Sequence, residues 1–390
     1  TIDHLKTGLQ WEKQINKKLS LDSYAFYANR DFVGRLPFGF GGFVDLKRNY
    51  YGLGTSLEYE PKTNHRMQFR FSLADQKDHR MRYKNLSGER GDNTLDQDEN
   101  FYNYALSFLD EIKLSFGLLR LGLRYDHNKL GTQSEVDQVE LKSLNPSIGF
   151  TYTNFGNHIM FFSYSSSFET PTLNELSANP SGSLGFNPNL SPSKAKNFEL
   201  GWRFTAPEIL FETTLYKINT QDEILPYEIT SFPGRNFYRN TGNTNRIGIE
   251  FLWEHRKGPL DWTLAYNYAA LKFDDYILGD KNLSGNHLPG VPNQQLSASL
   301  SYRFLRDWNF LIQNQYTGTL YADDLNQNKV ADFNVLNIRF WKSFNQLSFF
   351  GGINNSFDTE YFDNIRINAF GKRYYEPAPN RNFYFGFSLT

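Results

Sequence analysis

The chain has 390 residues, with 41 basic and 42 acidic side chains, a formal charge of -1 and no cysteine. This balance gives no support to a nucleic-acid partner, and the lack of cysteine excludes thiolate metal sites and cysteine nucleophiles while fitting an oxidising exterior. No apolar run approaches the roughly 20 residues that a transmembrane helix needs, so a helical membrane protein is excluded.

Short segments in which apolar and polar residues alternate recur along the chain. In residues 295–304 (QLSASLSYRF), every second residue is apolar and the residues between are Gln, Ser or Arg. A period of two is typical of a strand with one apolar and one wet face. This pattern predicts about seventeen strands, near residues 4–14, 19–31, 47–60, 66–76, 100–111, 116–128, 143–153, 158–168, 195–206, 209–221, 244–256, 260–273, 293–304, 307–319, 331–343, 346–356 and 380–390.

Alternation alone is compatible with two folds, a soluble sandwich and a membrane barrel. The lengths of the connections between the strands distinguish them. Minimal turns are predicted near residues 16–18, 62–66, 154–157, 207–208, 257–258, 306–307 and 345–346. Connections of about twenty residues or more are predicted near 76–98, 169–194, 222–243 and 358–379. Short turns on one side and long loops on the other are typical of outer-membrane β-barrels, and the 17% aromatic content fits their interfacial girdles.

The first residues, 1–14 (TIDHLKTGLQWEKQ), read as a loop that runs into a strand, with no apolar signal segment. Bacterial single-chain barrels have even strand numbers, so seventeen strands predict that about five strands and whatever precedes them are not in this chain. We therefore expect an all-β fold, a transmembrane antiparallel β-barrel of which residues 1–390 are the C-terminal part.

Three stretches carry a family resemblance. Residues 163–200 contain Phe-x-Thr-Pro-Thr-x-x-Glu-Leu, then Asn-Pro-x-Leu-x-Pro and Glu-Leu-Gly. Residues 354–360 (NNSFDTE) and 371–386 (GKRYYEPAPNRNFYFG) look like a C-terminal signature, and residues 286–292 (NHLPGVP) like a strand entry. Together these stretches resemble the TonB-dependent outer-membrane receptors, over roughly residues 125–390.

The resemblance implies a 22-stranded barrel whose lumen holds an N-terminal plug domain that is not in this chain. It implies an active-transport receptor in the outer membrane of a Gram-negative bacterium, without bond chemistry and without a cofactor of its own. A scarce ligand would bind at the extracellular face, and the TonB–ExbB–ExbD complex would act through the plug. We also expect contact with outer-membrane lipid and lipopolysaccharide, no nucleic acid, and a monomer.

The ligand is suggested by a narrower likeness. Residues 174–177, 185–187, 322–324 and 373–377 are similar to the branch that imports pyrroloquinoline quinone, although many siderophore receptors share most of these residues. Pyrroloquinoline quinone is the ligand expected first, and a ferric siderophore is the alternative. A passive porin and an outer-membrane barrel enzyme are further alternatives.

An anionic ligand of either kind predicts a site that pairs aromatic faces with basic groups, because guanidinium meets carboxylate through two parallel hydrogen bonds. Basic residues with aromatic neighbours in the sequence occur at the expected outer strand ends and loops. We expect the ligand to contact Arg48, Arg235, Arg366, Tyr50, Tyr238 and Tyr374.

An enzyme site finds little support in the sequence. The seven histidines form no His-x-x-x-His pair, and there is no Gly-x-Ser-x-Gly elbow around the serines at 163–167. Acidic pairs such as Asp323-Asp324 could ligate calcium, but they lack calcium-loop spacing, and we expect them to be solvated loop residues. We expect neither a catalytic nor a metal site, and we expect Glu175 to cap a short turn.

Overall fold

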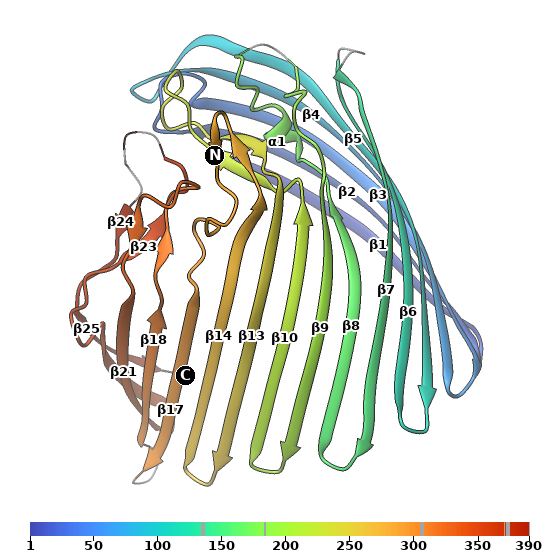
Figure 1. Cartoon of the computed structure of the whole chain (residues 1–390), viewed down its shortest axis with the longest axis vertical. Coiled ribbons are helices and arrows are strands. Elements are labelled where there is room, and N and C mark those ends of the chain that lie inside the picture. The colour runs from blue at the N-terminus through green and yellow to red at the C-terminus, as the bar shows by residue number, and fades with distance from the viewer. Residues whose placement is uncertain (134–136, 183–184, 305–307, 370, 372–374, 390) are drawn as a thin grey trace. The chain divides into compact units, whose positions relative to one another are not determined.

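The computed structural model describes residues 1–390 except 134–136, 183–184, 305–307, 370, 372–374 and 390. Seventeen strands carry the fold in this described part (Figure 1). They are β1 (Ile2–Asn16), β2 (Leu19–Arg35), β3 (Phe43–Lys62), β4 (His65–Leu86), β5 (Glu89–Leu114), β6 (Gly117–Thr132), β7 (Val139–Phe155), β8 (His158–Glu169), β9 (Ser193–Ala206), β10 (Ile209–Gln221), β13 (Asn243–Lys257), β14 (Leu260–Asp275), β17 (Gln294–Phe304), β18 (Trp308–Thr317), β21 (Phe333–Phe344), β22 (Leu347–Asn354) and β25 (Asn382–Leu389). The seventeen predicted strands are confirmed.

Two residues separate the strands at each of seven connections, namely β1–β2, β3–β4, β5–β6, β7–β8, β9–β10, β13–β14 and β21–β22. Asn345 and Gly258 have positive φ angles of 48° and 61° in two of these turns, a conformation that Gly and Asn adopt at least cost. The predicted minimal turns are therefore confirmed, except the one at 306–307, which lies outside the described residues.

The connection predicted at residues 76–98 is different from the expected loop. Strands β4 and β5 continue through it to a tight turn at Ser87 and Gly88, both of which have positive φ angles. The prediction was wrong because a segment rich in charge is typical of a loop, whereas the register places Arg48 opposite Asp78 and His79 opposite Asp98 in a regular ladder. Charges that pair across the ladder can occupy strand positions.

The remaining long connections contain short elements. The helix α1 (Leu173–Leu176) begins with a capping box, in which Thr172 and Glu175 each accept a hydrogen bond from the other's backbone N–H. The expectation that Glu175 caps a short turn is thus confirmed. The short strands pair as hairpins: β11 (Ile224–Tyr227) with β12 (Phe237–Asn240), β15 (Ile277–Leu278) with β16 (Lys281–Asn282), β19 (Leu320–Tyr321) with β20 (Lys329–Val330), and β23 (Phe362–Ile365) with β24 (Tyr375–Pro377).

The chain divides into two compact units. Unit 1 comprises Thr1–Phe150, Ser163–Lys196 and Thr220–Thr241, and unit 2 comprises Thr151–Phe162, Asn197–Asn219 and Gly242–Thr390. In unit 1, strands β1 to β6 form an antiparallel meander in which each strand pairs with the next along the chain.

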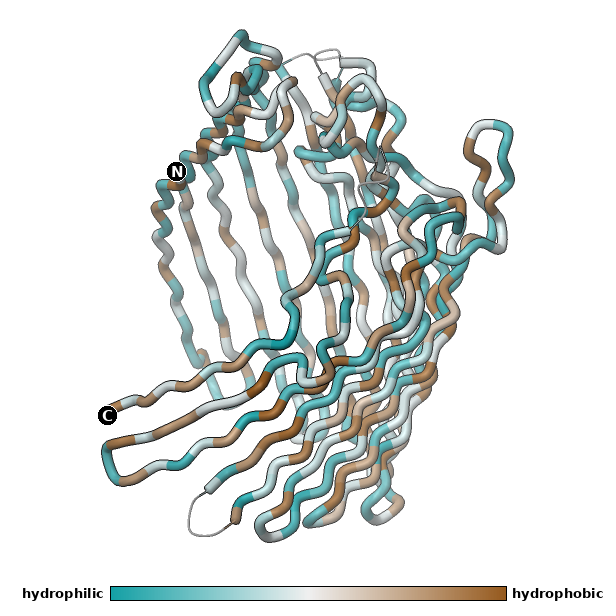
Figure 2. Tube along the Cα trace, turned by 90° about the vertical axis from the view of Figure 1, so that its left-hand side faces the viewer, coloured by the Kyte–Doolittle hydropathy of each residue, from teal (hydrophilic) through white to brown (hydrophobic). Residues whose placement is uncertain are grey.

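The two faces of this meander differ in chemistry, because successive residues of a strand point to opposite faces. One cross-strand row is wholly apolar: Leu21, Leu57, Phe69, Phe108 and Leu123. The row next to it, one residue along each strand, is polar: Asp22, Ser56, Arg70, Ser107 and Arg124. Figure 2 shows hydrophilic and hydrophobic residues alternating along strands of the sheet.

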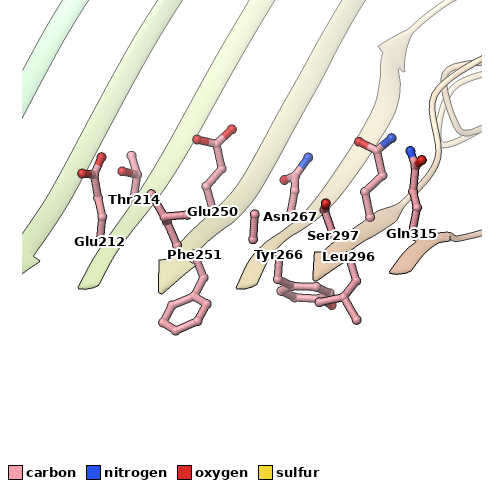
Figure 3. Close-up of a pocket in the computed structure, with 12 residues that line it drawn as sticks. Glu212, Thr214, Glu250, Phe251, Tyr266, Asn267, Leu296, Ser297 and Gln315 are labelled. Atoms are coloured by element: carbon pink, nitrogen blue, oxygen red, sulfur yellow. The ribbon is translucent and has the colours of Figure 1, made fainter. Parts of the chain in front are cut away.

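In unit 2, strands β13, β14, β17, β18, β21, β22 and β25 pair in that order. Figure 3 shows the alternation at one level of this unit, along a hollow of about 490 Å³. Phe251, Tyr266 and Leu296 project to one side, while Glu250, Asn267 and Ser297 project to the other.

The apolar face is exposed rather than buried in a core. Leu53, Phe69 and Leu123 retain 46%, 47% and 45% of their accessible surface. Each exposed apolar side chain of this size would cost about 1.5–3 kcal/mol in water compared with burial, and rows of them form patches that soluble monomers avoid. A face of this kind is stable against lipid. Among the described residues, no helix is long and apolar enough to span a membrane.

Candidate functional site

The candidate site lies on the polar face of unit 1, at the end where the connections are long. A barrel strand crosses a membrane in about 9–11 residues. Asp78 is the fourteenth residue of β4, counted from His65, so it and the residues after it lie beyond the crossing. Alternation places Asp78, Arg80 and Arg82 of β4 on the same face as Arg48 of β3, and cross-strand pairing adds Glu99 of β5.

The first ion pair of the site joins Arg48 to Asp78. Arg48 donates from Nε to Oδ1 at 2.8 Å and from Nη2 to Oδ2 at 2.6 Å, the two-bond geometry that suits guanidinium and carboxylate. The Asp78 side chain is fully buried. The charge of Arg48 is therefore compensated within the wall.

The second ion pair joins Arg80 to Glu99 and attaches a loop to the strands. Arg80 donates from Nε and Nη2 to the two Glu99 oxygens at 2.9 and 3.1 Å. Glu99 also accepts a hydrogen bond from the Ser177 hydroxyl, just after α1. Gln97 strengthens the attachment, because it donates to Glu99 at 3.1 Å and accepts from the Gly185 N–H at 2.8 Å.

Two further arginines in the site carry charge that no carboxylate compensates. Arg82 and Arg235 are 8% and 9% exposed, and neither forms an ion pair among the described residues. Burial, followed by repulsion from Arg235 and Arg80, lowers the pKa of Arg82 to about 9. Burial and then the charge of Arg80 lower the pKa of Arg235. With a pKa of about 9, Arg82 remains mostly cationic at neutral pH.

Aromatic rings surround Arg235. Its guanidinium carbon lies 4.9 Å from the ring centre of Phe237 and 6.0 Å from that of Phe232. Phe237 is fully buried, and the Phe232 ring also contacts Phe40 at 4.7 Å. Loop 36–42 therefore packs against loop 228–236 at this site. Cations over ring faces are favourable, but this contact does not neutralise the charge.

The structure brings four of the six predicted contact residues into unit 1. Arg48 and Tyr50 lie on the polar face of β3, Arg235 lies in the loop before β12, and Tyr238 lies in β12. Tyr50 packs its ring edge-on against Phe26, with 5.0 Å between the ring centres. Arg366 follows β23 in unit 2, and Tyr374 lies outside the described residues.

Sequence reasoning missed the part of this site that β4 supplies, Asp78, Arg80 and Arg82. The signal was available in the alternation of Arg80 and Arg82 with Met81 and Tyr83, which puts both arginines on the face of Asp78. The charged composition of this segment predicted a loop, and alternation assigns residues to faces only in a strand.

The exposed apolar rows, the two-residue turns and the structured long connections define an antiparallel β-barrel of the outer membrane. The chain belongs to the family described as TonB dependent receptor-like, beta-barrel, whose model matches residues 2–356.

Relatives with curated descriptions and with solved structures agree with this family. The vitamin B12 transporter BtuB of Photobacterium profundum is 26% identical over 215 residues, which cover 54% of this chain and 33% of that protein. The siderophore receptor PiuA from Acinetobacter baumannii has a TM-score of 0.77 at 16% identity, covering 100% of this chain and 64% of that one. The ferric citrate transporter FecA in its unliganded form has a TM-score of 0.81 at 18% identity, covering 99% and 61%.

The chain therefore spans a third of the curated relative and about two thirds of the solved structures. At these identities the solved structures show the shared fold, and the ligands in their names belong to those proteins.

Proposed function

We propose that this chain is the C-terminal part of the barrel of a TonB-dependent receptor that imports a scarce anionic ligand across the outer membrane. The observation that carries the anionic character is the charge of the site in unit 1. Four guanidinium groups lie in this site, those of Arg48, Arg80, Arg82 and Arg235. Among the described residues, two of them form ion pairs, Arg48 with Asp78 and Arg80 with Glu99. An anion that enters such a site meets positive charge that is already desolvated.

The remaining parts of the transport machinery belong to the same proposal. A plug domain and the first barrel strands would precede residue 1, and the TonB–ExbB–ExbD complex would supply the energy through the plug. The exposed apolar rows would face lipid and lipopolysaccharide, and the receptor would act as a monomer.

Two ligand classes fit the charge. A ferric siderophore or similar iron chelate is supported by the names of the solved relatives, which include a siderophore receptor and a ferric citrate transporter. Pyrroloquinoline quinone, a flat tricarboxylate, is supported by the sequence likeness alone. We place the contacts of either ligand at Arg48, Tyr50, Arg235 and Tyr238 of unit 1. Arg366 and Tyr374 stay predictions from the sequence alone.

The test is a titration of the whole receptor, purified from its native outer membrane, with pyrroloquinoline quinone and separately with a panel of ferric siderophores and ferric citrate. Binding is followed by tryptophan fluorescence. Saturable quenching by one class identifies it. Uptake of that ligand by cells should then stop when TonB is deleted, and uptake that continues at the same rate without TonB would contradict the proposed function.

A further inference from the structure

The polar atoms around Arg82 lack partners to an unusual degree. The Nε atoms of Arg82 and Arg235 and the Oγ1 atom of Thr94 are buried without a hydrogen-bond partner among the described residues. Arg82 uses one donor, Nη1, which reaches the Gly41 carbonyl at 3.3 Å. Arg82 and Thr94 both lie beside Gly41, and the charges of Arg82 and Arg235 repel each other. Buried polar atoms are nearly always satisfied, so these unsatisfied donors indicate a missing acceptor.

The group that would satisfy these donors is an anion. Breaking or omitting one partner of a buried ion pair is strongly unfavourable, and here two like charges share a desolvated site. The neighbouring carboxylates cannot supply the compensation, because Asp78 is occupied by Arg48 and Glu99 by Arg80. An anion between Arg82 and Arg235 would accept hydrogen bonds from the free donors and remove the repulsion.

The surroundings restrict the shape of that anion. Phe232 and Phe237 present rings beside the guanidinium of Arg235, and the Phe40–Phe232 contact holds the two loops together over this side of the site. A carboxylate or phosphate group offers two oxygens to a guanidinium fork, and an apolar part of the same ligand can lie against the rings.

We propose that Arg82 and Arg235 form a binding site for an oxyanion, a carboxylate or phosphate group, with Thr94 as a supporting hydrogen-bond partner. Its assignment to a group of the imported ligand rests on the function proposed above, whereas the binding of the anion does not. Arg48 and Arg80 do not belong to this anion site, because their charges are already paired with Asp78 and Glu99.

The probes are citrate and inorganic phosphate, and the sample is the whole receptor purified from native outer membrane at pH 7 and constant ionic strength, with chloride as reference. The thermal midpoint is measured by intrinsic fluorescence for wild type, Arg82→Gln, Arg235→Gln and the control Arg66→Gln. Arg66 lies on the same strand, 48% exposed, and pairs with Glu58 at 2.6 Å.

Wild type and Arg66→Gln should show a saturable rise in midpoint with at least one probe, and each site variant should bind that probe about tenfold more weakly, the loss of one charge-assisted contact. A larger effect of citrate than of phosphate assigns the site to carboxylates, and the reverse assigns it to phosphates. Without added anion, Arg82→Gln should have an unchanged or higher midpoint, because it removes repulsion.

Equal stabilisation of wild type and site variants, or no stabilisation of wild type by either probe, would overturn the proposed site. So would a lower midpoint of both site variants without anion together with no response of wild type, since that pattern means a carboxylate of the receptor itself fills the position. TonB-dependent uptake is measured separately, so a failure of the anion site and a failure of the transport function give different results.

Discussion

Ser177 donates a hydrogen bond from its hydroxyl to Glu99, a residue 78 positions earlier in the chain. Through this bond the segment that follows α1 is fixed to β5, and through the Arg80–Glu99 pair it is fixed to β4 as well. The buried Glu99 carboxylate therefore accepts hydrogen bonds from Ser177, Arg80 and Gln97, and these bonds hold the segment after α1 against β4 and β5.

Replacement of that carboxylate should be costly. Glu99→Gln removes the charge that compensates the buried Arg80, and we expect a loss of about 3–5 kcal/mol of unfolding free energy. The adjacent change Asp98→Asn serves as the control, because the Asp98 side chain is 68% exposed and its contact with His79 is a surface pair worth about 0–1 kcal/mol. Denaturant titration of the purified receptor distinguishes the two, and equal losses would argue against the buried pair.

The assignment of the two faces gives a second prediction. Phe71 and Ser72 are neighbours on β4 and project to opposite faces. Phe71→Arg puts a charge on the lipid face and should cost about 2–4 kcal/mol near the midplane, whereas Ser72→Arg should cost less than about 1 kcal/mol. Folding into lipid vesicles, followed by the heat-dependent shift in gel mobility, measures both. A reversed order would mean that the faces are assigned the wrong way round.

In unit 2, a buried aspartate connects three loops. Asp324 is 1% exposed and accepts hydrogen bonds from the Tyr276 hydroxyl at 3.1 Å and from Asn368 Nδ2 at 3.0 Å. Tyr276→Phe removes one hydrogen bond to a charged group, so the unfolding free energy should fall by about 1.5–3 kcal/mol. Tyr302→Phe, on an exposed ring, should change it by less than about 0.5 kcal/mol. Proteolysis within residues 276–288 should increase in the first variant alone.

The stability of the same loops should depend on pH through His287. Burial, and then the charge of Lys272, lowers the pKa of His287 in the folded state. The unfolded chain then binds a proton more readily than the folded chain, so the stability contributed by neutral His287 is complete above the unfolded pKa and decreases as the pH falls below it.

The midpoint of wild type should accordingly fall between pH 7 and pH 5 by more than the midpoint of His287→Gln. The comparison is made in buffers of equal ionic strength. Parallel pH curves for the two proteins would show that His287 does not contribute to the acid sensitivity of these loops.

The sequence predicted strands and turns well because both have local causes. Alternation of apolar and polar residues, as in 295–304, is enough to predict a strand. Odd and even positions of the strand point to opposite faces, so the two faces also follow from the sequence without knowledge of tertiary contacts. The pairs Arg120–Glu111, Arg124–Asp126 and Arg203–Glu212 likewise follow from arginines on wet faces that need nearby carboxylates.

The long connections could not be predicted in the same way. Residues 76–98 look like a loop by composition, and only the cross-strand register shows that their charges pair. Arg82 and Arg235 are 153 positions apart in the chain. Nothing in the sequence indicates that the fold brings their two charges close enough to repel each other. Sequence proximity to aromatic residues was the reason to predict Arg235 and Tyr238, and it gave no reason to choose Arg82.

The β4–β5 hairpin has one more implication, for the engineering and evolution of this receptor. Its strands of 22 and 26 residues are about twice the length needed to cross a membrane or more, and its tip at Ser87 and Gly88 is a two-residue turn. A ladder of this length transmits little disturbance from its tip to its base. Short peptide segments inserted between Ser87 and Gly88, by engineering or in evolution, should thus be tolerated without disturbing the lower parts of the two strands.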